Sequence, residues 1–329
     1  MRTDDLDYEL PASAIAQVPA EPRDAARLLV EHGPGRALEH RRVCELPSLV
    51  GPGDVVVVND TRVRRARLRC RRATGGRVEV LLVTELGAGR WEALVRPGRR
   101  IRDGDVLRAE DGAVNVTVVA DLGHGLRAVA LDGDPETVGD VPLPPYIHEP
   151  LADAERYQTV YARRLGSAAA PTAGLHLTPG VLEGCRRAGA VVVAVELVVG
   201  LDTFQPIIGS DVDDHVIHTE AYSVPESTWE ACLAAERVLA VGTTAVRALE
   251  SVASTGALEG RTALFIRPGY HFEVVDRLLT NFHVPRTSLL ALVASFVGDR
   301  WRELYAEAMA EGYRFLSFGD AMLLERSTS

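Results

Sequence analysis

The sequence contains no lysine, and all 36 of its basic residues are arginine. It has only four cysteines, which lie far apart: Cys44, Cys70, Cys185 and Cys232. This spacing argues against a zinc site, an iron–sulfur cluster and a disulfide framework, and it fits a reducing cytoplasm. The longest apolar run, 190–201, is interrupted by Glu196 and is too short to cross a bilayer. The charged residues at 1–5 lead into no apolar segment, so we expect no secretory signal and a cytoplasmic protein.

The composition is that of a folded protein with a substantial core. The chain has 329 residues, enough for two domains, and 47% of them are hydrophobic. Its net charge of −10 speaks against indiscriminate binding of nucleic acid.

Arginines are concentrated between residues 62 and 72. In a strand, the period of two would place Arg65, Arg67, Arg69 and Arg71 on one face and apolar side chains on the other. Such a ribbon suits phosphate contacts, but a solvated strand in an arginine-biased protein has the same pattern. Both interpretations stay open.

Two kinds of sequence pattern occur in different parts of the chain. Short alternating runs punctuated by glycine and proline occupy 77–83, 90–95, 114–119 and 126–131, and they predict a small antiparallel barrel or sandwich. Continuous apolar runs at 54–58, 190–199 and 238–241 instead predict buried strands of an α/β domain. We therefore predict a discontinuous α/β main domain (1–62 and 148–329) interrupted by an inserted β-barrel (63–147).

Further elements of the α/β domain follow from capping and periodicity. Thr178 before Pro179 indicates a helix start, and the helix should run to about Cys185. We expect helices at 227–235, 243–252, 288–296 and 299–311, and strands at 262–266 and 318–324.

The stretch 166–180 is the first candidate site. It consists of small residues around one ionisable side chain, His176, and it contains Gly174, which can take a positive φ. It leads into the helix start at Thr178, which is a ready anion site. A packed, alanine-rich connector would have the same composition.

Polar residues after buried strands are the second group of candidates, because open α/β sheets bind ligands at the carboxyl ends of strands. Asp60 and Arg62 follow the strand at 54–58, although a capped turn explains that motif almost as well. The turn Gly242-Thr243-Thr244 opens a helix and suits a phosphate or a small carboxylate, with Arg247 one turn further on.

Taken together, the motifs resemble those of the S-adenosylmethionine:tRNA ribosyltransferase-isomerase family of queuosine biosynthesis (the QueA family). The similarity runs nearly end to end. The segments that carry it are Asp7-Tyr-Glu-Leu-Pro11, Asn59-Asp-Thr-Arg-Val63, Pro142-Leu-Pro-Pro-Tyr-Ile147, Tyr157-Gln-Thr-Val-Tyr-Ala162, Ala169-Ala-Pro-Thr-Ala-Gly-Leu-His176, Asp214-His215…His218…Glu220, Gly242-Thr-Thr244 with Val246-Arg247, Thr280-Asn-Phe-His283 and Gly319-Asp-Ala-Met322.

The resemblance implies an α/β domain interrupted by a six-stranded β-barrel, and it implies an activity. The family uses S-adenosylmethionine (AdoMet) as a ribosyl donor. The ribosyl moiety is transferred to 7-aminomethyl-7-deazaguanine in tRNA and isomerised to give epoxyqueuosine, while adenine and methionine leave. The reaction needs a base for the C5′ proton, a proton donor for adenine and a pocket for the methionine carboxylate. The sulfonium already acidifies C5′–H, so no metal is expected, and we expect a monomer.

Residue roles are carried over from motif position. The candidates for proton transfer are His176, His215 and His218, supported by Asp214 and Glu220. We assign Gly242, Thr243, Thr244 and Arg247 to the AdoMet carboxylate. Asp60, Arg62, Thr172 and Gly174 are assigned to ligand positioning.

The chain departs from the family pattern at several polar positions. Val198 replaces a histidine that the family usually has, and Asp202 replaces a glycine. These changes leave open a related AdoMet-dependent enzyme with a small 7-deazapurine acceptor, or a non-catalytic AdoMet- or RNA-binding relative.

Overall fold

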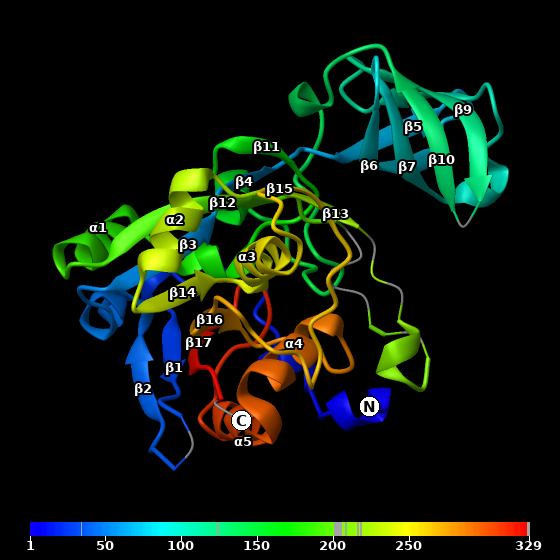
Figure 1. Cartoon of the computed structure of the whole chain (residues 1–329). Helices are drawn as coiled ribbons and strands as arrows, with labels where there is room; N and C mark the ends of the chain where they lie inside the picture. Colours follow the sequence, from blue (N-terminus) through cyan, green and yellow to red (C-terminus); the bar gives the residue numbers. More distant parts are fainter. Residues whose placement is uncertain are drawn as a thin grey trace. The chain divides into compact units, whose positions relative to one another are not determined.

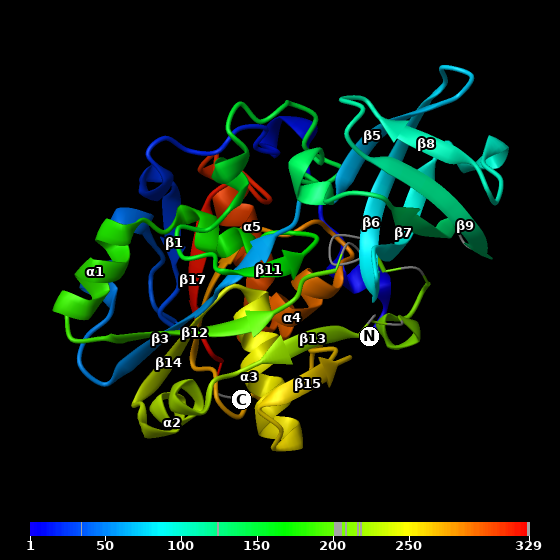
Figure 2. The same ribbon diagram turned by 90° about the horizontal axis from the view of Figure 1, so that it is seen from above.

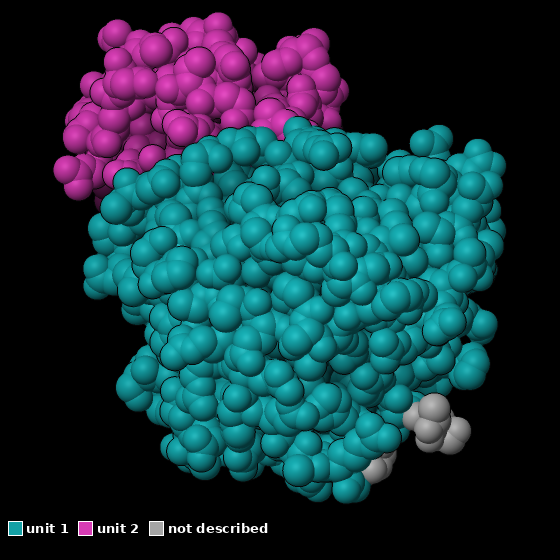
Figure 3. All heavy atoms as spheres, turned by 90° about the vertical axis from the view of Figure 1, so that its left-hand side faces the viewer, with its two compact units in different colours: residues 1–62, 144–164, 170–329 teal, residues 63–143, 165–169 magenta. Residues whose placement is uncertain are grey.

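A computed structural model describes residues 1–33, 35–123, 125–200, 206–207, 209–215, 217 and 219–327. The chain divides into two compact units, the first formed by 1–62, 144–164 and 170–329 and the second by 63–143 and 165–169 (Figure 3). That these units are separate domains with boundaries at residues 63 and 147 stays a prediction.

The first unit is built on a large mixed sheet (Figures 1 and 2). Among the described residues its nine strands have the order β15-β13-β12-β3-β14-β16-β17-β1-β2. In that order their bounds are Glu259–Thr262, Glu220–Ser223, Val191–Leu197, Asp54–Asn59, Arg237–Val241, Arg277–Asn281, Ala321–Glu325, Arg27–Val30 and Glu39–Arg42. The neighbours β12, β3, β14 and β16 are parallel, whereas β17 runs antiparallel to β16. The predicted α/β class is confirmed.

Both faces of the parallel strands are covered, which explains their continuous apolar sequences. In β3 the run Val55–Val58 is at most 4% exposed. One face packs in a cluster with α1 (Pro179–Arg187) and the 3-10 helix η8 (Thr172–His176). Helix α3 (Thr243–Thr255) contacts the same strands and contributes nothing to that cluster, so it covers the opposite face. The other α-helices in the described part of the chain are α2 (Glu226–Ala234), α4 (Ser288–Val297) and α5 (Trp301–Ala310).

The predicted start of α1 is confirmed, but its N-terminus offers no empty anion site. Thr178 is the N-cap, and its Oγ1 accepts a hydrogen bond from the N–H of Val181 at 3.2 Å. The same hydroxyl donates to Asp24 Oδ2 at 3.0 Å, so a carboxylate of the chain itself lies there.

Gly174 does not use the positive φ that a glycine allows, because it lies inside η8 with an ordinary backbone conformation. The lack of room for a side chain explains why this position is a glycine. A Cβ at this position would overlap the hydroxyl of Tyr161 and come within 3.0 Å of Thr159 Cγ2.

The second unit is a closed antiparallel barrel of six strands in the order β10-β7-β6-β5-β8-β9, as the family resemblance implies. The bounds in chain order are β5 Arg67–Arg72, β6 Arg77–Gly87, β7 Arg90–Arg96, β8 Val106–Ala109, β9 Asn115–Gly123 and β10 Leu126–Leu131. A separate two-stranded sheet consists of β4 (Thr61–Val63) and β11 (Arg164–Ser167). The alternation predicted for β5 is confirmed, since Leu68 and Cys70 are buried in the barrel core and Arg69 and Arg71 are exposed.

One predicted strand is wrong. The strand expected at 262–266 instead ends at Thr262, as β15, and 263–267 are irregular. The bounds of β15 are set by its backbone pairing with β13. Its residues Glu259, Gly260 and Arg261 are exposed and show no apolar pattern that could predict a strand. None of the helices in the described part of the chain has the length and hydrophobicity to span a bilayer.

Candidate active site

One hollow of the first unit lies where the parallel strands end. Because β12, β3, β14 and β16 are parallel neighbours, the residues that follow them meet at one edge of the sheet. A pocket with about 330 Å³ of empty space, including its opening to solvent, lies at this edge. Its lining residues are Ala170, Pro171, Thr172, Ala173, Val199, Gly242, Thr243, Thr244, Thr280, Asn281, His283 and Leu289.

The turn between β14 and α3 forms one wall. Gly242 has φ 88° and ψ 154°, a conformation that is essentially restricted to glycine. Among the described residues no side chain caps α3, so its first backbone N–H groups, in the turn that lines the pocket, have no capping partner there. Thr244 is 7% exposed, and its buried Oγ1 has no hydrogen-bond partner among the described residues. The predicted candidates Gly242, Thr243 and Thr244 thus lie together at a site suited to an anion.

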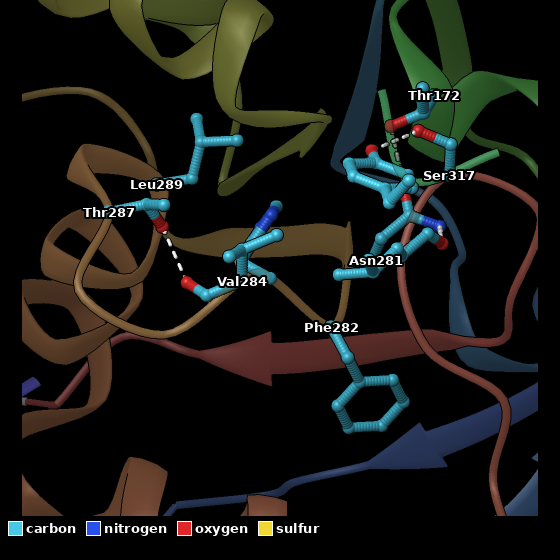
Figure 4. A pocket seen from close by; sticks show the side chains of 10 residues that line it. Thr172, Asn281, Phe282, Val284, Thr287, Leu289 and Ser317 are labelled. Carbon is cyan, nitrogen blue, oxygen red and sulfur yellow. Dashed lines mark hydrogen bonds between the residues drawn. The ribbon is translucent and has the colours of Figure 1, made fainter. Parts of the chain in front are cut away.

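Asn281, at the end of β16, lines the pocket and is hydrogen-bonded to two residues of η8. Its Oδ1 accepts a hydrogen bond from Thr172 Oγ1 at 2.9 Å, and its Nδ2 lies 2.9 Å from His176 Nε2. Asn281 and Thr172 also line a second hollow of about 260 Å³ (Figure 4). Ser317 and Thr287 belong to the same lining.

His176 is buried and does not line either hollow. Burial, followed by the charges of Arg314 and Arg23, lowers its pKa to about 4. With the Asn281 amide donating to Nε2, the imidazole carries its proton on Nδ1 and uses its free lone pair to hold the amide. In this structure His176 therefore fixes Asn281 rather than facing the pocket.

His283 is the histidine that does line the pocket, and the sequence-based candidates did not include it. Its Nε2 is 2.9 Å from Thr280 Oγ1, and burial lowers its pKa to about 3. The backbone around it is held on both sides: its N–H donates to Tyr305 Oη at 2.9 Å, and its carbonyl accepts from Tyr8 Oη at 2.5 Å. Its position after a buried strand, the signal that pointed to Asp60, could have identified it.

The other cofactor-binding candidates lie away from the described pocket lining. Asp60 is buried at the end of β3, where burial raises its pKa and its Oδ1 has no hydrogen-bond partner among the described residues. Arg62 pairs with Glu155 at 2.5 Å. Arg247 forms an ion pair with Glu220, and its Nε donates to the carbonyl of Leu264 at 3.0 Å.

None of the described residues of the predicted catalytic cluster (Asp214, His215 and Glu220) lines the pocket. Asp214 is exposed, and the ring of His215 packs edge-on against Phe265 at 5.7 Å. Glu220 is buried, where it binds Arg247 and accepts from the N–H of Gly200 at 2.9 Å. His218 and Asp202 lie outside the described residues.

No group of three or more histidine, cysteine or acidic side chains suited to a metal ion occurs within the described ranges. The pocket is lined by hydroxyl, amide and imidazole groups and by apolar side chains. Such a lining can bind a polar organic ligand and hold its carboxylate at the start of α3.

Comparison with known proteins places the chain in a family. A family described as "Queuosine biosynthesis protein" matches residues 3–324. The chain belongs to this family of α/β proteins with an inserted barrel, the S-adenosylmethionine:tRNA ribosyltransferase-isomerases. A relative with that name from Rubrobacter xylanophilus is 55% identical over 98% of both chains, and one from Thermus thermophilus is 51% identical over 97% of this chain and 98% of its own. A crystal structure of S-adenosylmethionine tRNA ribosyltransferase from Thermotoga maritima covers 97% of this chain and 99% of its own, at 36% identity and a TM-score of 0.57.

Proposed function

We propose that this protein transfers the ribosyl moiety of AdoMet to 7-aminomethyl-7-deazaguanine in tRNA and isomerises it, giving epoxyqueuosine and releasing adenine and methionine. The names of relatives that match nearly the full chain support this reaction. They do not favour the alternative of a small 7-deazapurine acceptor. The predicted monomer and the absence of a metal from the reaction stay predictions.

The observation that carries the proposal is the wall formed by Gly242, Thr243 and Thr244. The uncapped start of α3 offers backbone N–H donors, and Thr244 Oγ1 is a buried hydroxyl that has no partner among the described residues. A carboxylate would satisfy both, as the methionine end of AdoMet requires. We leave Arg247 out of this site because it binds Glu220 and does not line the pocket.

The proton chemistry needs a neutral acceptor beside the sulfonium. His283 lines the pocket and stays neutral at physiological pH because burial lowers its pKa. We assign to it the acceptance of a hydrogen bond from the ribose side of AdoMet, since a pKa lowered to about 3 makes this imidazole a poor base for the C5′ proton. His176 would act through Asn281 as a positioning residue. The catalytic roles of Asp214, His215, His218 and Glu220, and the ligand-positioning roles of Asp60 and Arg62, stay predictions.

The test is incubation of the purified protein with AdoMet and tRNA that carries 7-aminomethyl-7-deazaguanine. Mass spectrometry would follow the release of adenine and methionine and the mass gain on the tRNA. Turnover coupled to that mass gain supports the proposal. Turnover only with the free base or its nucleoside would replace tRNA by a small acceptor.

A variant connects the activity to the pocket. Thr244→Val keeps the shape of the side chain and removes the hydroxyl, so we expect AdoMet to bind about tenfold more weakly, the effect of losing a hydrogen bond to a charged group. Thr84→Val, the same change on an exposed barrel strand, is the control. Equal AdoMet affinity of the two variants in calorimetric titration would contradict the proposed carboxylate site.

A further inference from the structure

Three of the four arginines of the predicted ribbon, Arg67, Arg69 and Arg71, pair with carboxylates of the second unit. Arg69 pairs with Asp140 at 2.8 Å, and Arg71 pairs with Glu110 at 2.9 Å. The neighbouring ion pairs are Arg64–Glu85, Arg67–Glu79 and Arg72–Asp105. Because each of these guanidinium groups faces a carboxylate, β5 is a weaker attraction for phosphate than the sequence indicates.

A second group of arginines lies at one end of the same barrel. Arg96 ends β7, and Arg99, Arg100 and Arg102 follow within six residues, on and after the short 3-10 helix Gly98–Arg100. The strand register adds Arg77: Arg96 lies opposite Glu79 in β6, so Arg77 at the start of β6 belongs to the same end. All five side chains are exposed. We call these residues the arginine end of the barrel.

The carboxylates at this end are bound to other arginines. Asp103 and Asp121 both pair with Arg127, at 3.8 and 2.9 Å. The nearby Glu79 and Asp105 pair with Arg67 and Arg72 of the β5 region, at 3.7 and 3.8 Å.

None of the five guanidinium groups of the arginine end has a carboxylate partner among the described residues. In a chain with net charge −10, they form a local excess of positive charge. Closely spaced arginines of this kind bind a polyanion because phosphate contacts release condensed counterions. An arginine side chain can also form two parallel hydrogen bonds to one phosphate, so these arginines can hold phosphate groups at defined positions.

We propose that the arginine end of the barrel binds the phosphate backbone of the RNA acceptor, while β5 does not. The inference rests on the proposed function only in the identity of the acceptor as tRNA. Phosphate contacts position the RNA without reading its bases, so this surface raises affinity for tRNA in general.

The experiment measures binding of tRNA carrying 7-aminomethyl-7-deazaguanine by fluorescence anisotropy, from 50 to 300 mM NaCl. Three proteins are compared: the unchanged chain, the double variant Arg99→Gln/Arg100→Gln and the control Arg69→Gln/Arg71→Gln. At 100 mM salt we expect the first variant to bind at least tenfold more weakly and the control to change less than twofold. The dependence of log K on log salt should become shallower by about 1.5 for the first variant, about 0.7–0.9 for each lost contact.

AdoMet affinity, measured by calorimetry on the same proteins, should be unchanged in both variants, which shows that they are folded. Equal loss in the two variants, wild-type salt dependence in the first, or no tRNA binding by the unchanged chain would each overturn the proposal. Failure of the proposed function would give a different result: tRNA would bind through Arg99 and Arg100, but adding tRNA would not change the release of adenine.

Discussion

The ion pair between Glu220 and Arg247 provides the sharpest test of which candidate residues bind ligand. Arg247, on α3, has a side chain that is 12% exposed, and Glu220, on β13, is 8% exposed. Glu220 also accepts from the N–H of Gly200, and Arg247 donates to the carbonyl of Leu264. The pair thus joins a helix, a strand and two irregular segments. We expect it to stabilise the fold rather than to bind AdoMet.

The size of the effect follows from burial. Replacing Arg247 by alanine leaves the Glu220 carboxylate in a poorly solvated place without its guanidinium, which costs about 3–5 kcal/mol of the free energy of unfolding. For a unit of this size that corresponds to a drop of about 10 °C in Tm. The double variant Glu220→Gln/Arg247→Met removes both charges at similar volume and should recover more than half of the loss, because no buried charge remains.

Thermal denaturation and calorimetric titration with AdoMet separate the two roles. We expect the double variant to bind AdoMet within threefold of the unchanged protein. A double variant that regains stability but binds AdoMet more than tenfold weaker would refute this reasoning. It would return Arg247 to the carboxylate site that its motif predicts.

Two further predictions concern η8 and the buried histidines. Gly174→Ala places a methyl group on the Tyr161 hydroxyl, so we expect a loss of about 1–3 kcal/mol by denaturant unfolding, and Gly174→Ala/Tyr161→Phe should recover part of it; no loss would contradict the contact. Burial lowers the pKa of His176 to about 4 and that of His283 to about 3 in the folded protein. As the pH falls, these histidines are therefore protonated in the unfolded chain at a higher pH than in the folded one. Their contribution to stability is complete above about pH 6.5 and falls as pH drops toward 4, by up to about 1.4 kcal/mol per pH unit for each histidine. His176→Gln should make that fall shallower, and an unchanged slope between pH 7 and 4.5 would contradict it.

Strands with a regular burial pattern could be predicted from the sequence, and those without one could not. β10 has the predicted bounds, and β3 and β14 begin and end within one residue of theirs. Their sequences show the continuous apolar run or the apolar alternation that such burial requires. β8 was missed because Val106 points outward and is 52% exposed, which breaks the apolar alternation. β1 was missed because it has only four residues and lies in a charged, proline-rich segment.

The candidate site shows the same limit. The turn Gly242-Thr243-Thr244 could be predicted because strand, glycine turn and helix are adjacent in sequence. His283 and Asn281 could not be ranked above His176, since only the packing of η8 against β16 shows which side chain faces the pocket and which one holds its neighbour. A motif identifies polar residue types, but burial and hydrogen bonding decide their roles.

Strand direction explains one motif whose purpose the sequence does not show. The segment Gly319–Met322 leads into β17 and contains its first two residues, so the rule that ligands lie after parallel strands gives it no place at the site. However, β17 is antiparallel to β16, and Asn281 lies opposite Ala321, so the residues before β17 reach the edge at which β16 ends. There Asn281 Nδ2 lies 3.3 Å from the carbonyl of Leu316, and Ser317 lines the second hollow. The antiparallel pairing of β17 with β16 thus brings residues from near the end of the chain into the wall of the second hollow.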